Sequence, residues 1–144
     1  MSFFIDFSWG SLNKVGEELC GDKVEFFRTH DSVIAVLSDG LGSGVKANIL
    51  ATLSSKIAIT MLKAGLSIDE VVDTMVHTLP VCQVRKLAYS TLTIVKINQD
   101  DQVYVVEIDN PSLFFWRDGE ILKVKAEERV INQRKIKEST FKLQ

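Results

Sequence analysis

The segment whose residue types and spacing best suit a chemical function is Asp39-Gly40-Leu41-Gly42-Ser43-Gly44. Its three glycines allow a tight turn and leave room for a ligand close to the main chain. An aspartate that ends an apolar strand holds its carboxylate in a fixed place, and the next carbonyl can point the same way. Hard divalent cations such as Mg²⁺ and Mn²⁺ prefer oxygen ligands of this kind. The spacing therefore favours a metal site in which Asp39 is a ligand.

Two other interpretations of this segment stay open on spacing alone. A glycine loop before a helix can cradle phosphate, but the Gly-Lys-Ser/Thr ending is absent and Asp39 would repel an anion unless a metal lay between them. The segment could also be a plain strand-to-helix turn with Ser43 as the N-cap. Upstream, Gly21-Asp22 is a turn pair by itself, and Asp22 becomes a ligand only if adjacent strands bring it beside Asp39.

The elements before this segment are predicted to be strands. Aromatic and β-branched residues favour strands over residues 3–9 and 24–28. The almost continuous apolar run in residues 32–38 is typical of a strand that is covered on both faces. Residues 29–32 between the second and third strands form the expected hairpin turn.

Two helices are predicted to follow. Apolar residues repeat every four positions from Val45 in two rows, which predicts a helix over residues 43–63 that is buried on more than one side and ends at Gly65. Ser67 and Glu70 fit a capping box, in which each side chain satisfies a free amide of the first turn. The second helix therefore begins at Ser67 and stops at Pro80.

The last part of the chain returns to strands, predicted over residues 89–97, 103–108, 112–116 and 121–124, with turns at 98–101 and 117–120. Lys and Arg in residues 117–142 are interleaved with Glu, which indicates solvated strand and turn surface. This order predicts an α+β fold of layered antiparallel β-sheets flanked by helices.

Composition narrows the class of protein. The 144 residues suit one domain, and 46% hydrophobic with 25% charged residues is ordinary for a globular chain. A net charge of −2 gives no general attraction for nucleic acid. We expect a cytoplasmic protein, because the first ten residues lack a signal pattern and no apolar run reaches the roughly 18 residues of a membrane span.

The remaining histidines and cysteines are interpreted as structural or surface residues. His30 lies in a predicted turn and His77 on a helix, and neither has a cysteine or an acid at metal-ligand spacing. Cys20 and Cys82 are too few for a disulfide scaffold and are expected to stay reduced.

A family resemblance rests on the order of these motifs. Cys20-Gly21-Asp22, a strand pair, Ser38-Asp39-Gly40-Leu41-Gly42-Ser43-Gly44, two helices and Tyr89-Ser90-Thr91-Leu92-Thr93 resemble the type 2C metal-dependent protein phosphatases. The sequence looks closest to their bacterial SpoIIE-like branch. Residues 110–114 followed by 117–120 resemble the family's next hairpin.

This resemblance implies a metal centre. By position, Asp39 would bridge two Mn²⁺ or Mg²⁺ ions, Gly40 would offer its carbonyl, and Asp22 would bind one ion. Gly42, Ser43 and Gly44 would support the loop. The implied reaction is hydrolysis of phosphoserine or phosphothreonine, on an anti-anti-sigma-like regulatory protein, by water activated between metals roughly 3.5–4 Å apart.

The sequence also departs from the family pattern. Two further family aspartates lack a counterpart in the matching context, because Asp118-Gly119 and Asp100-Asp101 are predicted turn pairs. Residues 1–144 are therefore expected to be the N-terminal portion of one phosphatase domain, incomplete at the C-terminus and nearly inactive alone. The alternatives are a non-catalytic regulatory or partner-binding module and, more weakly, a nucleotide-binding loop. An open sheet edge could pair two copies in a homodimer.

Overall fold

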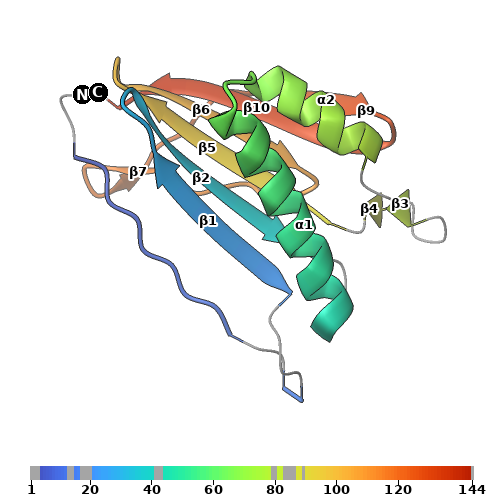
Figure 1. The fold of residues 1–144 in the computed structure, drawn as a ribbon. Coiled ribbons are helices and arrows are strands. Elements are labelled where there is room, and N and C mark those ends of the chain that lie inside the picture. The colour runs from blue at the N-terminus through green and yellow to red at the C-terminus, as the bar shows by residue number, and fades with distance from the viewer. Residues whose placement is uncertain are drawn as a thin grey trace.

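The computed structural model describes residues 4–12, 15–16, 21–40, 44–78, 81–82, 87–88 and 90–143, without the side chains of 81–82 and 87–88. Its centre is a six-stranded, fully antiparallel sheet (Figure 1). In spatial order the strands are β1 (Asp22–Arg28), β2 (Ser32–Asp39), β5 (Leu92–Asn98), β6 (Gln102–Ile108), β10 (Arg134–Lys142) and β9 (Ala126–Ile131). Two short pairs, β3 (Val81–Cys82) with β4 (Leu87–Ala88) and β7 (Trp116–Arg117) with β8 (Glu120–Ile121), lie outside it.

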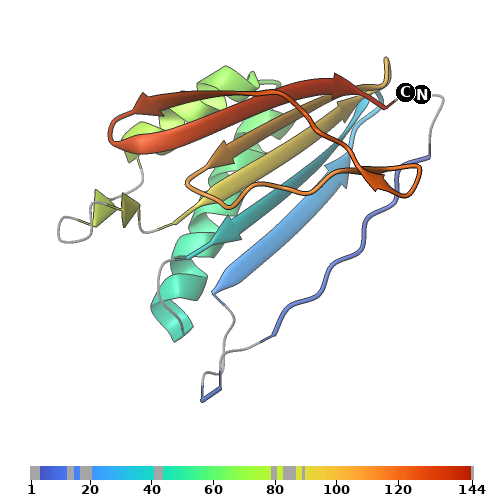
Figure 2. The ribbon, with the colours of Figure 1, turned by 180° about the vertical axis from the view of Figure 1, so that it is seen from behind.

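Both helices, α1 (Gly44–Lys63) and α2 (Ile68–Thr78), cover one face of this sheet, as the front and back views show (Figures 1 and 2). The main core fills the space between them. It joins aliphatic residues of the central strands, such as Ile34, Ile94 and Ile108, to Val72 and Met75 of α2. The predicted α+β class is confirmed, and the described residues contain one such large sheet.

Helix α1 follows the predicted range but is buried along one side only. Ala47, Ala51 and Ala58 are fully buried, and their small side chains let the helix lie close to the strands. The row formed by Val45, Ile49 and Leu53 is 48–61% exposed. The prediction of burial on more than one side was wrong, because the sheet covers a single face of the helix.

Contrary to the expectation that no apolar run would reach the length of a membrane span, the stretch Val45–Lys63 of α1 is long and apolar enough to cross one by length and composition, although its buried side packs in the core. Such a stretch is weak evidence for a membrane span, since core helices pass the same test.

Helix α2 begins as predicted. The amide of Ser67 donates to Glu70 Oε2 at 2.8 Å, and the amide of Glu70 donates to Ser67 Oγ at 3.2 Å. This reciprocal pair is the expected capping box. The buried stripe of α2 then follows helical spacing through Val71, Val72, Met75 and Val76.

The other face of the sheet is covered by irregular chain. The connection from β6 to β9 crosses it (Figure 2) and places Leu113 and Phe115 against Ile97, Val103 and Val105.

The N-terminal segment also packs on this face. Phe7 stacks on Phe26 with ring centroids 5.2 Å apart, and Arg28 donates to the Ile5 carbonyl. Residues 4–12 form no strand, so the prediction for 3–9 was wrong. Their aromatic residues make side-chain contacts with β1 instead of joining the ladder.

The end of the chain holds elements that the sequence pattern did not locate. Strands β9 and β10 form a hairpin whose turn residues, Asn132 and Gln133, have φ of 50° and 65°. Of the predicted strands 112–116 and 121–124, only the two-residue pieces β7 and β8 form. Interleaved Glu, Lys and Arg obscured the alternation in β9 and β10, because only scattered apolar residues mark the positions that pack inwards, such as the buried Ile136 and the half-buried Phe141.

Candidate metal centre

The centre of the predicted site is the open end of the β1–β2 pair. The antiparallel register places Asp22 directly opposite Asp39. Both side chains lie on the face away from the helices, since alternate residues of a strand share a face and Phe27, of opposite parity, belongs to the helix-side core. The Gly40 amide donates to the Gly21 carbonyl at 2.8 Å and closes this end of the ladder. The structure thus brings together the two aspartates that the sequence analysis proposed as ligands.

The two carboxylates disturb each other. The pKa of Asp39 is raised from 3.8 to about 6, chiefly by partial desolvation and further by a hydrogen bond and charge repulsion from Asp22. Directly opposed like charges destabilise an antiparallel pair, so the arrangement favours either a shared proton or a bound cation. A divalent cation would remove this repulsion, and the carboxylate oxygens fit the preference of Mg²⁺ or Mn²⁺.

Gly40 is where α1 touches the site. A β-carbon at this position would lie 1.9 Å from the Ala47 carbonyl oxygen of α1. No side chain fits there without moving the helix, so glycine lets the end of β2 and the first turns of α1 meet. The glycine that the sequence analysis proposed as a carbonyl ligand therefore has a separate steric requirement.

Beneath the aspartates lies a buried polar layer that sequence reasoning missed. Ser38 and Ser90 are 0% and 1% exposed, and their hydroxyls are 2.7 Å apart. Ser38 Oγ also donates to the Thr91 carbonyl at 2.8 Å, and the Thr91 amide donates to the Asp39 carbonyl at 2.9 Å. The one signal in the sequence was a serine at the end of an otherwise apolar strand.

The predicted loop is described only in part. Leu41, Gly42, Ser43 and Cys20 lie outside the described residues, whereas Gly44 is the first residue of α1. Within the described part of the chain, no group of three or more His, Cys, Asp or Glu side chains is close enough to hold a metal ion. Asp22 and Asp39 thus form a two-carboxylate arrangement.

The other sequence candidates lie in ordinary places. The His30 side chain is 94% exposed in the turn before β2, and His77 is exposed on α2 beside Asp73. Asp118 and Gly119 form the β7–β8 turn with φ of 53° and 81°, and Asp101 turns the chain between β5 and β6. Their interpretation as surface and turn residues is confirmed.

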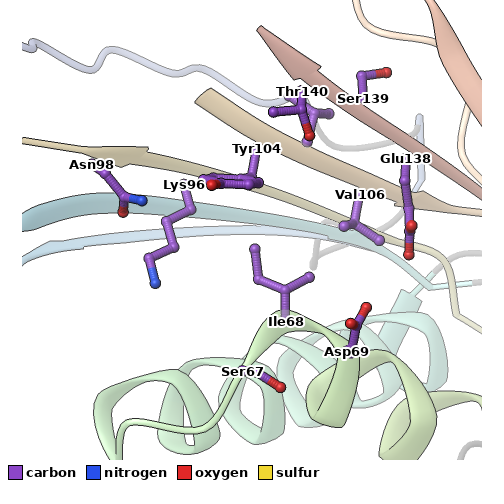
Figure 3. Close-up of a pocket in the computed structure, with 11 residues that line it drawn as sticks. Ser67, Ile68, Asp69, Lys96, Asn98, Tyr104, Val106, Glu138, Ser139 and Thr140 are labelled. Carbon is purple, nitrogen blue, oxygen red and sulfur yellow. The ribbon is translucent and has the colours of Figure 1, made fainter. Parts of the chain in front are cut away.

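A cavity of about 330 Å³ lies away from this centre (Figure 3). Lys96, Tyr104 and Ile68 line it, between the start of α2 and the sheet. These strand residues lie towards the end of β5 where Asn98 pairs with Ser32, whereas Asp39 is at the opposite end of β2. The cavity therefore does not belong to the carboxylate site.

Comparison with known proteins supports the family resemblance seen in the sequence. The family model for stage II sporulation protein E (SpoIIE) matches residues 29–143, which include Asp39 and Gly40 and begin after Asp22. The chain belongs to the SpoIIE family. It is thus a relative of the type 2C (PP2C) phosphatase domains, as its resemblance implied.

Solved structures share the SpoIIE-family fold. The PP2C phosphatase domain of SpoIIE from Bacillus subtilis, solved with a fragment of its regulatory domain, superposes with a TM-score of 0.77 at 23% identity over 92% of this chain. RsbX in complex with magnesium gives 0.54 at 26% identity over 69%. The RsbU and RsbW domains of Rv1364c from Mycobacterium tuberculosis give 0.53 at 16% identity over 65%.

The SpoIIE-family chain covers only part of these structures. It spans 40% of the SpoIIE chain, 47% of the RsbX chain and 27% of the Rv1364c chain. A search of curated proteins gave no significant match.

The contact between Gly40 and α1 gives a first prediction. Gly40→Ala should lower the free energy of unfolding by about 1–3 kcal/mol, because α1 must shift to admit the methyl group. Urea denaturation followed by circular dichroism measures this. Gly10→Ala is the control, since a β-carbon there meets nothing within 4 Å. Equal stability of the two variants would contradict the close approach.

The raised pKa of Asp39 gives a second prediction. The folded state holds this proton more tightly than the unfolded state, so the stabilisation is complete below pH 3.8 and is lost as the pH rises through about 6. Without metal, Asp39→Asn should therefore be more stable than the wild type at pH 7.5. We expect a gain of about 1 kcal/mol after allowance for the exposure of the site, and no gain near pH 3.5.

Urea unfolding in chelator across this pH range measures the difference. Asp118→Asn in the β7–β8 turn is the control, because asparagine also tolerates positive φ there. If the difference in free energy of unfolding between Asp39→Asn and the wild type did not vary with pH, the raised pKa of Asp39 would be contradicted.

Proposed function

We propose that this chain carries the front part of a metal-dependent protein serine/threonine phosphatase centre. The observation that supports it most directly is the pairing of Asp22 with Asp39 at the end of the β1–β2 ladder, inside a SpoIIE-family fold. Asp39, Asp22 and the Gly40 carbonyl would hold Mn²⁺ or Mg²⁺, with the loop that contains Gly42, Ser43 and Gly44 as support. When bound, the two ions would activate water for in-line attack on phosphoserine or phosphothreonine.

The protein's own contribution is to hold these groups in place. The ladder sets the separation of Asp22 and Asp39, and the hydrogen bond from Thr91 fixes the Asp39 main chain. The absence of a side chain at Gly40 lets α1 pack against this end of β2. Rigid placement of ligands before the reaction is how such sites stabilise developing charge.

We further propose that residues 1–144 are catalytically incomplete by themselves, because the described residues bring only two carboxylates together. The substrate would be a phosphorylated regulatory protein of the anti-anti-sigma type in the cytoplasm. A non-catalytic regulatory module is the second candidate, and the same two-carboxylate arrangement favours it. The open edges at β1 and β9 would allow a homodimer.

Titration with Mn²⁺ by calorimetry tests the proposed ligands. The wild-type chain should bind Mn²⁺ weakly, and Asp39→Ala should weaken binding at least about tenfold, equivalent to about 1.4 kcal/mol. Asp73→Ala, an exposed acid on α2, is the matched control and should bind like the wild type. Tight binding that survives Asp39→Ala would refute the ligand assignment.

Hydrolysis of p-nitrophenyl phosphate with Mn²⁺ tests completeness. The 144-residue chain should show no more activity than Asp39→Ala. An Asp39-dependent activity would show that the chain is a complete enzyme. No activity in a longer protein that contains this domain would favour the non-catalytic module.

A further inference from the structure

Arg134, at the start of β10, is the largest fully buried side chain in the described residues. Arginine stays charged at all ordinary pH values, and burying such a charge is costly unless it is paired and hydrogen-bonded. Its Nε donates to Asp109 Oδ2 at 2.9 Å, and its Nη2 donates to the Ser90 carbonyl at 2.5 Å. The guanidinium therefore links two chain segments at one end of the sheet.

Asp109 is held for this contact. It follows β6 with φ of 58°, a conformation that non-glycine residues rarely adopt. Its Oδ1 accepts the Lys135 amide at 3.0 Å while Oδ2 accepts Arg134. Asp109 thus fixes the guanidinium from β6 and leaves the Nη2 group directed at Ser90.

Ser90 connects this ion pair to the proposed metal centre. It forms an isolated antiparallel bridge with Gly40, and its hydroxyl lies 2.7 Å from that of Ser38. The next residue, Thr91, donates its amide to the Asp39 carbonyl. Both residues precede the first regular residue of β5, Leu92, so the ladder alone does not fix them.

We propose that Arg134 is a positioning residue for the Asp39–Gly40 centre. It holds the Ser90 carbonyl from the helix side of the sheet and so keeps Ser90 and Thr91 against Asp39 and Gly40. This inference rests on the proposed function for its consequence in metal binding. Its structural part, the restraint of Ser90 and Thr91, can be tested without metal.

Amide hydrogen exchange of the metal-free protein tests the structural part. In Arg134→Met, the Thr91 and Gly40 amides should exchange at least about tenfold faster relative to amides in the middle of β2. Arg134→Lys, which keeps the charge but has fewer donors, should show a smaller increase. Ile136→Ala is the control: it removes a fully buried side chain on the same strand and keeps the hydrogen bond from Arg134 to Ser90, so it should accelerate exchange without changing this ratio.

Mn²⁺ titration of the same variants tests the consequence. Arg134→Met should weaken Mn²⁺ binding at least about tenfold, whereas Ile136→Ala should stay within about twofold of the wild type. An unchanged exchange ratio in both Arg134 variants would overturn the proposal, and Arg134→Lys alone decides it if Arg134→Met does not fold. A wild-type chain that binds no Mn²⁺ would refute the proposed function, while the exchange ratio would still decide whether Arg134 restrains Ser90.

Discussion

The antiparallel register of β1 and β2 is the constraint on which the proposed centre depends, since it sets Asp22 against Asp39 at the open end of the ladder. A shift of one residue would turn one carboxylate towards the helices. In the observed register Ile34 and Val36 of β2 are buried under the helices, so the same strand pairing forms the helix-side core and sets the two acids opposite each other.

This pairing opposes folding when both aspartates are charged. Burial first and Asp22 second raise the pKa of Asp39, and the buried core between the sheet and the helices offsets this cost. Functional sites commonly keep such locally unfavourable arrangements because the ligand relieves them. Under the proposed function, a bound divalent cation would relieve this repulsion.

The two faces of the sheet differ near the proposed centre: one holds the main chain in place and the other presents the carboxylates. The helix face carries the buried Ser38–Ser90–Arg134 layer beneath the site. The opposite face bears the carboxylates and is less covered at this end, where Leu37 is 37% exposed. Buried hydrogen bonds on one side can thus hold the main chain while the ligands on the other stay accessible.

The sequence by itself determined the local elements and the candidate ligands. Periodicity located α1 and α2, the Ser67–Glu70 pair marked the start of α2, and the apolar run identified β2 with Asp39 at its end. These features depend on neighbours within a few residues, so pattern alone reveals them. The same pattern failed at residues 3–9, where packing on β1 replaced strand pairing, and at β9 and β10, where charged residues hid the alternation.

Only the tertiary structure decided which distant residues meet. Strand pairing brought Asp22 to Asp39, which are 17 positions apart, and the insertion of β10 between β6 and β9 buried Arg134 beside Asp109 and Ser90. Nothing local distinguishes Arg134 from the other basic residues near the end of the chain, because its burial comes from the order of the strands. The acids of the candidate centre could therefore be named from the sequence, while the groups that hold them in place became visible only when the sheet was assembled.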